Sequence, residues 1–261
     1  MFFTRFPINV TRRETRRMLA SPYRMHAAVA GSFPSGVGAL EAGASQEGER
    51  GRVLWRVDQR KDGSTCLYIV SPTRPSLVGL NEQIGFPDIE PTWQTRDYAP
   101  FLEHLAMGQR YAFRLVANPT VSRSARGSNP DAINKQGNRI RLPHLTVVQQ
   151  EAWLVGKAAY NGTNVEVPEL FLRQSTTRAT RNGFEVLQDE AGIPRLIVSN
   201  SRELSFRKES QRKSITLATA QYDGVLEVTD VGALRHALAN GIGHGKGFGC
   251  GLLTLATLRG E

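Results

Sequence analysis

The amino-acid sequence predicts an α+β fold in which the order strand–helix–strand–strand–helix–strand occurs twice. Residues 53–57 alternate like a strand, a Lys-Asp-Gly turn follows, and residues 66–70 form an apolar returning strand. Residues 111–117 alternate more clearly and begin a second set of elements. An amphipathic helix, a glycine-rich stretch and an apolar strand then follow one another over residues 230–258. Two tandem ferredoxin-like (RRM-like) βαββαβ domains are therefore expected.

The first domain is expected to span residues 1–97. Ser21 and Pro22 predict the start of a helix that continues to residue 31, since serine is a preferred N-cap and proline is favoured at the first helical position. Met25 and Val29 share one stripe of that helix with Pro22, which should face the core. The other elements expected here are a strand at 2–10, a basic helix at 12–20, a short helix at 76–84 and a weak strand at 89–95.

The second domain is expected to span residues 98–261. After the strand at 111–117, a long basic segment runs over residues 118–143. Residues 171–184 are rich in Thr and Arg and fit neither a helix nor a strand clearly. The remaining elements expected are a helix at 145–159, strands at 195–207 and 214–229, a helix at 230–240 and a strand at 252–258.

The charge of the chain indicates a polyanionic partner. The 261 residues carry a formal net charge of +9 and a pI of about 10, which favours nucleic acid. A membrane surface is the weaker candidate, because the chain has no long basic amphipathic helix and no apolar run of about 18 residues. The only cysteines are Cys66 and Cys250, so a disulfide framework is not expected and a reducing cytoplasm fits.

The stretch from Gly241 to Gly251 has glycine at every second position. Glycines let a backbone approach a partner closely, and exposed amides of Gly243, Gly245 and Gly247 beside Lys246 would suit RNA phosphates. A nucleotide-binding P-loop is excluded, because that motif runs strand–loop–helix and has Ser or Thr after its Lys. The alternative is a connection that only closes the last helix onto the last strand, and composition leaves both interpretations open.

Tyr23 and His26 lie three residues apart and are therefore neighbours on one flank of the predicted helix. RNA carries its own nucleophile, the 2′-hydroxyl, so its cleavage needs a base, an acid and positive charge near the phosphate. Histidine titrates near neutral pH and can fill either proton-transfer role. Tyrosine, with an ordinary pKa of about 10, more easily donates or orients. The alternative is an aromatic–imidazole pair that only packs on the helix flank.

Basic residues gather in three segments, each of which is either an RNA contact or a solvated surface. They are the helix residues Arg12, Arg13, Arg16 and Arg17, the segment residues Arg123, Arg126, Lys135, Arg139 and Arg141, and the turn residues Arg207, Lys208, Arg212 and Lys213. Three such clusters in one basic chain make RNA contact by at least one of them the favoured interpretation. The five histidines are scattered without a metal-ligand spacing, so neither a metal nor another cofactor is expected.

Four segments resemble the CasE family, the endoribonucleases that cut CRISPR repeat RNA in type I-E systems. The most specific are Gly-Ile-Gly-x-x-Lys-x-Phe-Gly-x-Gly-Leu, here at 241–252, and Pro-Tyr-x-x-His, here at 22–26. The segment from Asn118-Pro119 to Arg141-Leu142-Pro143 and the run from Tyr222 to Asp230 also match. The matching segments span nearly the whole chain in the family's order.

The resemblance implies a metal-independent endoribonuclease that binds the CRISPR repeat hairpin and cuts precursor RNA at the 3′ base of the stem. It implies 2′-hydroxyl attack to give a 2′,3′-cyclic phosphate, with His26 required for cutting. The enzyme then stays bound to the mature guide RNA inside the surveillance complex (Cascade), with no membrane partner. By the same resemblance, the basic turn at 207–213 belongs to a hairpin that enters the groove of the repeat stem.

One departure from the family pattern concerns the turn after the histidine. Some relatives carry Lys or Arg there, whereas this chain has Ala27, Ala28 and Gly31. The charge that stabilises the transition state would then come from Arg24 or Lys246. The alternative function is a non-catalytic RNA-hairpin-binding subunit of a ribonucleoprotein, which would have no need of the Tyr–His pair.

Overall fold

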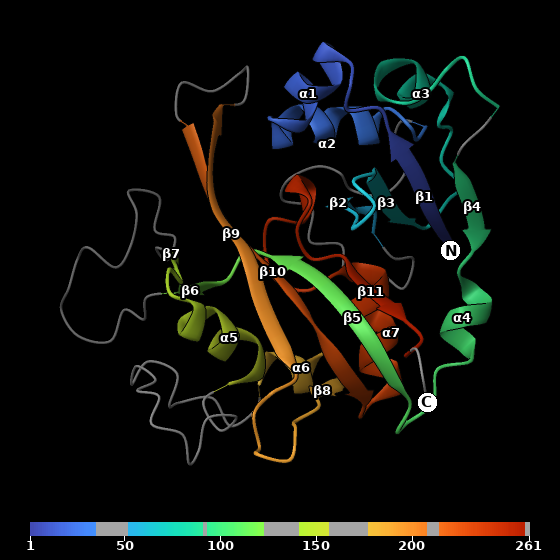
Figure 1. Cartoon of the computed structure of the whole chain (residues 1–261). Coiled ribbons are helices and arrows are strands. Elements are labelled where there is room, and N and C mark those ends of the chain that lie inside the picture. The colour runs from blue at the N-terminus through green and yellow to red at the C-terminus, as the bar shows by residue number, and fades with distance from the viewer. Residues whose placement is uncertain (35–51, 91–92, 123–140, 157–176, 208–213, 259–261) are drawn as a thin grey trace.

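The structure, a computed structural model, describes residues 1–34, 52–90, 93–122, 141–156, 177–207 and 214–258. Two antiparallel sheets form its framework, one from the first hundred residues and one from residues 110–256 (Figure 1). Each sheet has the strand order of the ferredoxin-like fold, so the predicted tandem repeat of that fold is confirmed.

The first sheet has the order β2-β3-β1-β4, with every pairing antiparallel. Its strands are β1 (Phe2–Ile8), β2 (Leu54–Gln59), β3 (Thr65–Ser71) and β4 (Gln94–Asp97). Three helices gather on one side of it: α1 (Arg13–Leu19), α2 (Pro22–Ala30) and α3 (Val78–Ile84) (Figure 1). Met25 and Val29 of α2 pack there against Phe6, Leu67 and Ile69 of the sheet, as the predicted apolar stripe requires.

The second sheet has the order β11-β5-β10, and both β8 and β9 pair with the far edge of β10. β10 is long enough for this, because its residues 214–224 face β9 and its residues 226–228 face β8. The elements of this half are β5 (Arg110–Ala117), α5 (Val147–Val155), α6 (Arg178–Arg181), β8 (Phe184–Val186), β9 (Leu196–Arg207), β10 (Ser214–Val228), α7 (Val231–Asn240), η4 (Lys246–Phe248) and β11 (Leu253–Ala256).

Several elements differ from the sequence prediction for local reasons. α5 begins two residues later than predicted because Thr146 and Gln149 form a capping box, and it ends at Gly156, whose φ is 74°. A short ribbon of β6 (Thr120–Ser122) and β7 (Arg141–Pro143) bounds the basic segment. A short helix, α4 (Ala99–Glu103), which was not predicted, begins the second half with proline in its first turn.

The second face of the first sheet packs against the second half of the chain. Leu54 and Val70 from that face share a core with Phe113, Leu115 and Leu252, so one apolar cluster crosses the predicted boundary. The division into domains at residues 97 and 98 stays a prediction, because side chains from both sides of that division share one core.

All five N–H donors of the Arg56 guanidinium on β2 are used, and three of them join the first half to the second. Nε and Nη2 donate to the Asp58 carboxylate at 2.6 and 2.8 Å. Nη1 donates to the backbone oxygens of Arg114 at 2.9 Å and Leu252 at 2.8 Å, and Nη2 also donates to Thr254 Oγ1 at 2.8 Å. The Arg56 and Asp58 residues are only 2% and 6% exposed, so this is a satisfied buried ion pair.

Within the described part of the chain, no helix is both long and apolar enough to cross a membrane.

Candidate active site

Helix α2 positions the Tyr23–His26 pair as its sequence predicts. The Ser21 hydroxyl accepts a hydrogen bond from the Arg24 backbone N–H at 3.4 Å, and Pro22 occupies the first turn. Met25 faces the core and is almost fully buried. Tyr23 and His26 therefore lie on the adjoining flank, where both are half-buried.

The Tyr23 side chain belongs to a small apolar cluster built mainly by the second half. Phe206, Leu217 and Cys250 are its buried members, and Tyr23 and Phe248 are among the partly buried side chains that pack on it. Phe206 comes from β9 and Leu217 from β10. The stem of the β9–β10 hairpin thus lies beside the first residue of the pair.

The His26 imidazole lies against the glycine-rich loop of the second half. The ring centroids of His26 and Phe248 are 6.1 Å apart, and Phe248 in turn meets Phe206 edge-on at 4.8 Å. A Cβ added to Gly247 would lie 3.4 Å from His26 Cε1 and 3.5 Å from Nδ1. The pair from the first half, Lys246 on η4 and the β9–β10 stem therefore meet at the joint between the halves.

The glycine-rich loop is tightly packed, which favours the structural interpretation at most of its glycines. Gly249 has a φ of 84°, and an added Cβ would lie 2.9 Å from the Trp55 ring. Gly243 and Gly245 also have positive φ and would place a Cβ 3.1 Å from Trp153 and Leu217, respectively. Gly247 differs, because its φ is ordinary and only the His26 ring lies near its position. Contact of these glycines and Lys246 with RNA remains a proposal.

Gly249→Ala is expected to lower the free energy of unfolding by about 1–3 kcal/mol, because it combines a left-handed φ with a clash against Trp55. Gly247→Ala is the matched control, since its methyl group would make only ordinary contact with His26. Urea unfolding of both variants measures the difference. Equal destabilisation would contradict the loop packing described above.

The structure describes some of the other predicted basic residues and leaves others outside its described ranges. Arg12, the N-cap residue of α1, donates to Glu82 O. On α1, Arg16 donates to Val10 O and Thr11 O, and Arg17 pairs with Glu14 at 2.6 Å. Arg12 and Arg16 therefore also hold nearby backbone in place. Arg141 begins β7 and Arg207 ends β9, and the side chains of these two residues are not described. Outside the described residues lie Arg123, Arg126, Lys135, Arg139, Lys208, Arg212 and Lys213.

The strands that flank the basic turn are placed next to the site. Arg207 pairs with Ser214, so β9 and β10 remain in register up to the turn. Figure 1 shows the two strands extending past the second sheet toward the side on which α1 and α2 lie. The packing of Tyr23 against the hairpin stem agrees with that direction.

Cys250 is the other titratable side chain in the apolar cluster that contains Tyr23, and it is not a proton-transfer candidate. Burial raises the pKa of the Cys250 thiol to about 12, so that thiol stays protonated and is a poor nucleophile at neutral pH. Both cysteines are free and buried. Among the described residues, no three His, Cys, Asp or Glu side chains converge as a metal site would require.

The aromatic residues around the pair were not identified from the sequence as parts of a site. Phe248 touches His26, Phe206 supports Phe248, and Trp55 packs under Gly249. The alternation of apolar and polar residues could show which face of its own strand Phe206 or Trp55 occupies. It could not show which distant element that face meets.

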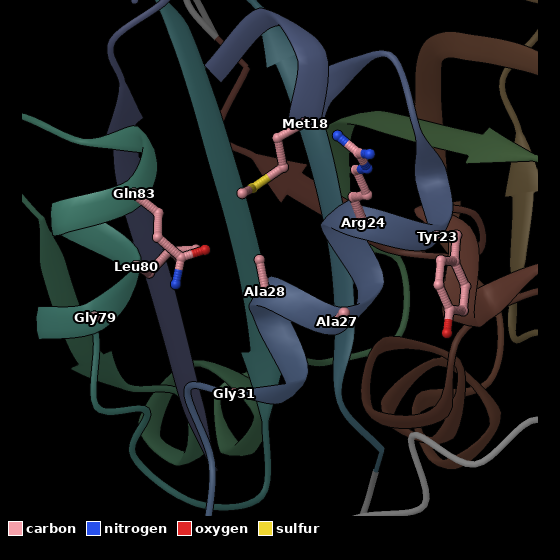
Figure 2. A pocket seen from close by; sticks show the side chains of 9 residues that line it. All are labelled: Met18, Tyr23, Arg24, Ala27, Ala28, Gly31, Gly79, Leu80 and Gln83. Atoms are coloured by element: carbon pink, nitrogen blue, oxygen red, sulfur yellow. The ribbon is translucent and has the colours of Figure 1, made fainter. Parts of the chain in front are cut away.

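A pocket of about 410 Å³ lies on the other flank of Tyr23, between α1, α2 and α3 (Figure 2). Tyr23 and Arg24 of α2 form part of its lining, as does Gln83 of α3. Tyr23 therefore separates two environments, the loop side with His26 and the pocket side.

Fold and site together define a class of protein: two tandem ferredoxin-like halves that hold a Tyr–His pair against a glycine-rich loop at their joint. The family described as "CRISPR associated protein" matches residues 1–257. The chain therefore belongs to that family.

Individual relatives extend over nearly the whole chain. The CRISPR-associated endoribonuclease Cse3 of Thermus thermophilus is 28% identical over 98% of this chain and 100% of its own length. The structure of Thermus thermophilus Cse3 bound to an RNA representing a pre-cleavage complex is 25% identical, with a TM-score of 0.64 over 98% of each chain. A chain of a CRISPR RNA-guided surveillance complex, in a pre-nicking state, is 23% identical, with a TM-score of 0.60 over 99% of this chain and 100% of that one; this likeness shows the fold alone.

Proposed function

We propose that the chain is a metal-independent endoribonuclease that binds the hairpin of CRISPR repeat RNA and cuts the precursor at the 3′ base of the stem. The observation that carries the proposal is the Tyr23–His26 pair, held by α2 against the glycine-rich loop. A non-catalytic RNA-binding subunit would not need a proton-transfer pair at that joint. Membership of the family and the name of the Thermus thermophilus relative support the same function.

The proposed reaction is an internal transesterification. The 2′-hydroxyl oxygen attacks the adjacent phosphorus, the bond to the 5′-oxygen breaks, and the products are a 2′,3′-cyclic phosphate and a 5′-hydroxyl. One proton leaves the 2′-hydroxyl and one reaches the departing 5′-oxygen, and we assign these transfers to His26 and Tyr23. Lys246, on the loop that touches His26, and Arg24 are the cations proposed to stabilise the phosphate in the transition state.

We assign recognition of the repeat stem to the basic hairpin and the basic segment of the second half. An A-form stem has a deep, narrow major groove, so it is recognised mainly through shape and phosphates. Arg207 ends β9, one strand of a stem that packs on Tyr23, and the basic residues 208–213 follow it in the sequence. The proposed RNA-binding residues are Arg123, Arg126, Lys135, Arg139, Arg141, Arg207, Lys208, Arg212, Lys213, Gly243, Gly245, Lys246 and Gly247.

We further propose that the protein keeps the mature guide RNA and joins other subunits of a CRISPR surveillance complex in the cytoplasm. The fold shared with a chain of such a complex supports this assembly. Two free, buried cysteines fit a reducing compartment.

The proposed reaction is tested by incubating the protein with repeat RNA in EDTA. Cleavage is expected to continue, because the RNA supplies the nucleophile, and the products should end in a 5′-hydroxyl and a 2′,3′-cyclic phosphate. An RNA with a single 2′-deoxy nucleotide at the cut should bind with unchanged affinity and stay intact. Cutting of the deoxy RNA, or cutting that requires added Mg²⁺, would contradict the mechanism, and binding without any cutting would favour the non-catalytic alternative.

A further inference from the structure

The pocket beside Tyr23 exists because small residues lie where α2 and α3 face each other and leave the space between the helices unfilled. Ala27, Ala28 and Gly31 form its α2 side, and Gly79 lies opposite on α3 (Figure 2). An added Cβ at Gly79 would meet nothing within 4 Å, so the space there is open. Tyr23 and Arg24, which have roles in the proposed reaction, line one side of this volume of about 410 Å³, and the rest of its lining has no role assigned so far.

The chemistry of the lining suits a flat, polar, uncharged or anionic group. Met18 from α1 and Leu80 from α3 add apolar surface, against which the face of an aromatic ring can pack (Figure 2). Gln83 offers both an amide donor and an acceptor, and the Arg24 guanidinium is a planar cation that can stack on a ring. None of the described residues that line the pocket carries a carboxylate, so the lining has no negative charge that would repel an RNA strand.

The position of the pocket relates it to the candidate catalytic pair. Along α2, Tyr23 lies between His26 on the loop side and Ala27 on the pocket side, because successive residues turn by about 100°. A nucleotide adjoining the phosphate at the Tyr–His pair can therefore place its base on the pocket side of Tyr23. The paired stem is assigned to the opposite side, where the β9–β10 hairpin packs.

We propose that this pocket binds the unpaired nucleobase immediately 3′ of the cut, an inference that rests on the proposed function. A paired base has its edges engaged and its faces stacked, whereas an unpaired base can insert between Met18, Leu80 and the Arg24 side chain. The pocket then holds the strand that leaves the stem and aligns the cut phosphate with His26.

The experiment compares normal repeat RNA with an RNA that lacks the base 3′ of the cut. In the wild-type protein, removal of this base is expected to lower the single-turnover cleavage efficiency by roughly 5–150-fold, the range for losing one stacked base. Gly79→Leu, which fills the open space, is expected to cause a similar loss with normal RNA and little further loss with the abasic RNA. Non-additive losses of this kind show that the base and the pocket act together.

Two controls keep the test decisive. Val78→Leu enlarges a neighbouring α3 residue that is 63% exposed and outside the pocket lining, and it should cut both RNAs like the wild type. Ala27→Leu is a second filling variant, on an exposed α2 position, for use if Gly79→Leu lowers the melting temperature. Equal cutting of normal and abasic RNA by the wild type, or losses that simply multiply, would overturn the pocket assignment alone. Failure of the wild type to cut normal RNA would instead overturn the proposed function, and this inference with it.

Discussion

His26→Ala is expected to slow cleavage of repeat RNA by about 10²–10⁴-fold, the usual effect of losing a general acid or base. The imidazole lies on a half-buried flank of α2 and against η4, so its loss removes the proposed proton-transfer group and leaves the apolar core under Met25 intact. Hairpin affinity should change little, because the proposed phosphate contacts lie mainly on the hairpin and basic segment. Single-turnover cleavage and equilibrium binding of the same RNA measure the two effects separately.

The matched controls are one variant of the pair and one distant histidine. Tyr23→Phe should slow cleavage less than His26→Ala, since the ring keeps its packing against the β9–β10 stem and loses only the hydroxyl. His236→Ala replaces an exposed histidine on α7, and we expect the wild-type rate. Cleavage at the wild-type rate by both Tyr23→Phe and His26→Ala would show that the pair only packs on the helix flank and has no part in the reaction.

Arg56→Met is expected to lower the free energy of unfolding by about 3–5 kcal/mol, the range for breaking a buried ion pair from one side. The change strands a carboxylate that is 6% exposed, together with the carbonyl oxygens of Arg114 and Leu252. Arg114 Nη1 lies 3.6 Å from the Asp58 carboxylate and compensates in part, which places the expected loss at the lower end of that range. Urea denaturation monitored by tryptophan fluorescence gives the free energy directly.

Two further variants separate burial from charge. Arg17→Ala breaks the exposed pair with Glu14, whose side chains are 49% and 67% exposed, and should cost no more than about 1 kcal/mol. The double variant Arg56→Met with Asp58→Leu should recover part of the loss, because neither ion then remains buried without its partner. A small effect of Arg56→Met alone would show that the guanidinium does not hold the two halves together.

Local patterns in the sequence were sufficient for the repeated fold and for the Tyr–His flank. Ser21 and Pro22 define the start of α2, and the 3.6-residue period then fixes which side Met25 and His26 face. These are properties of short segments, in which a residue interacts with neighbours three or four positions away. The strand order within each sheet did not follow from these short segments; it was expected because the βαββαβ order of elements matches the ferredoxin-like fold.

Contacts between distant segments were beyond those patterns. The alternation of β2 suggested a strand with one polar face, yet Arg56 and Asp58 are buried because the second half covers that face. The contact of Gly247 with His26 joins residues far apart in the chain, and no periodicity encodes such a pairing. Composition also could not show which glycines of the glycine-rich loop are needed for packing and which could contact RNA. The answer depends on which side chain lies beside each glycine.

The contact between α2 and the glycine-rich loop has a consequence for protein synthesis. A ribosome makes His26 early, whereas η4 and β11 follow only after nearly all the other described elements. During translation, a nascent chain therefore carries the proposed acid–base pair without the loop that faces it. The order of the elements along the chain thus delays assembly of the proposed site until η4 and β11 have been made, so an incomplete chain lacks the joint at which cleavage is proposed to occur.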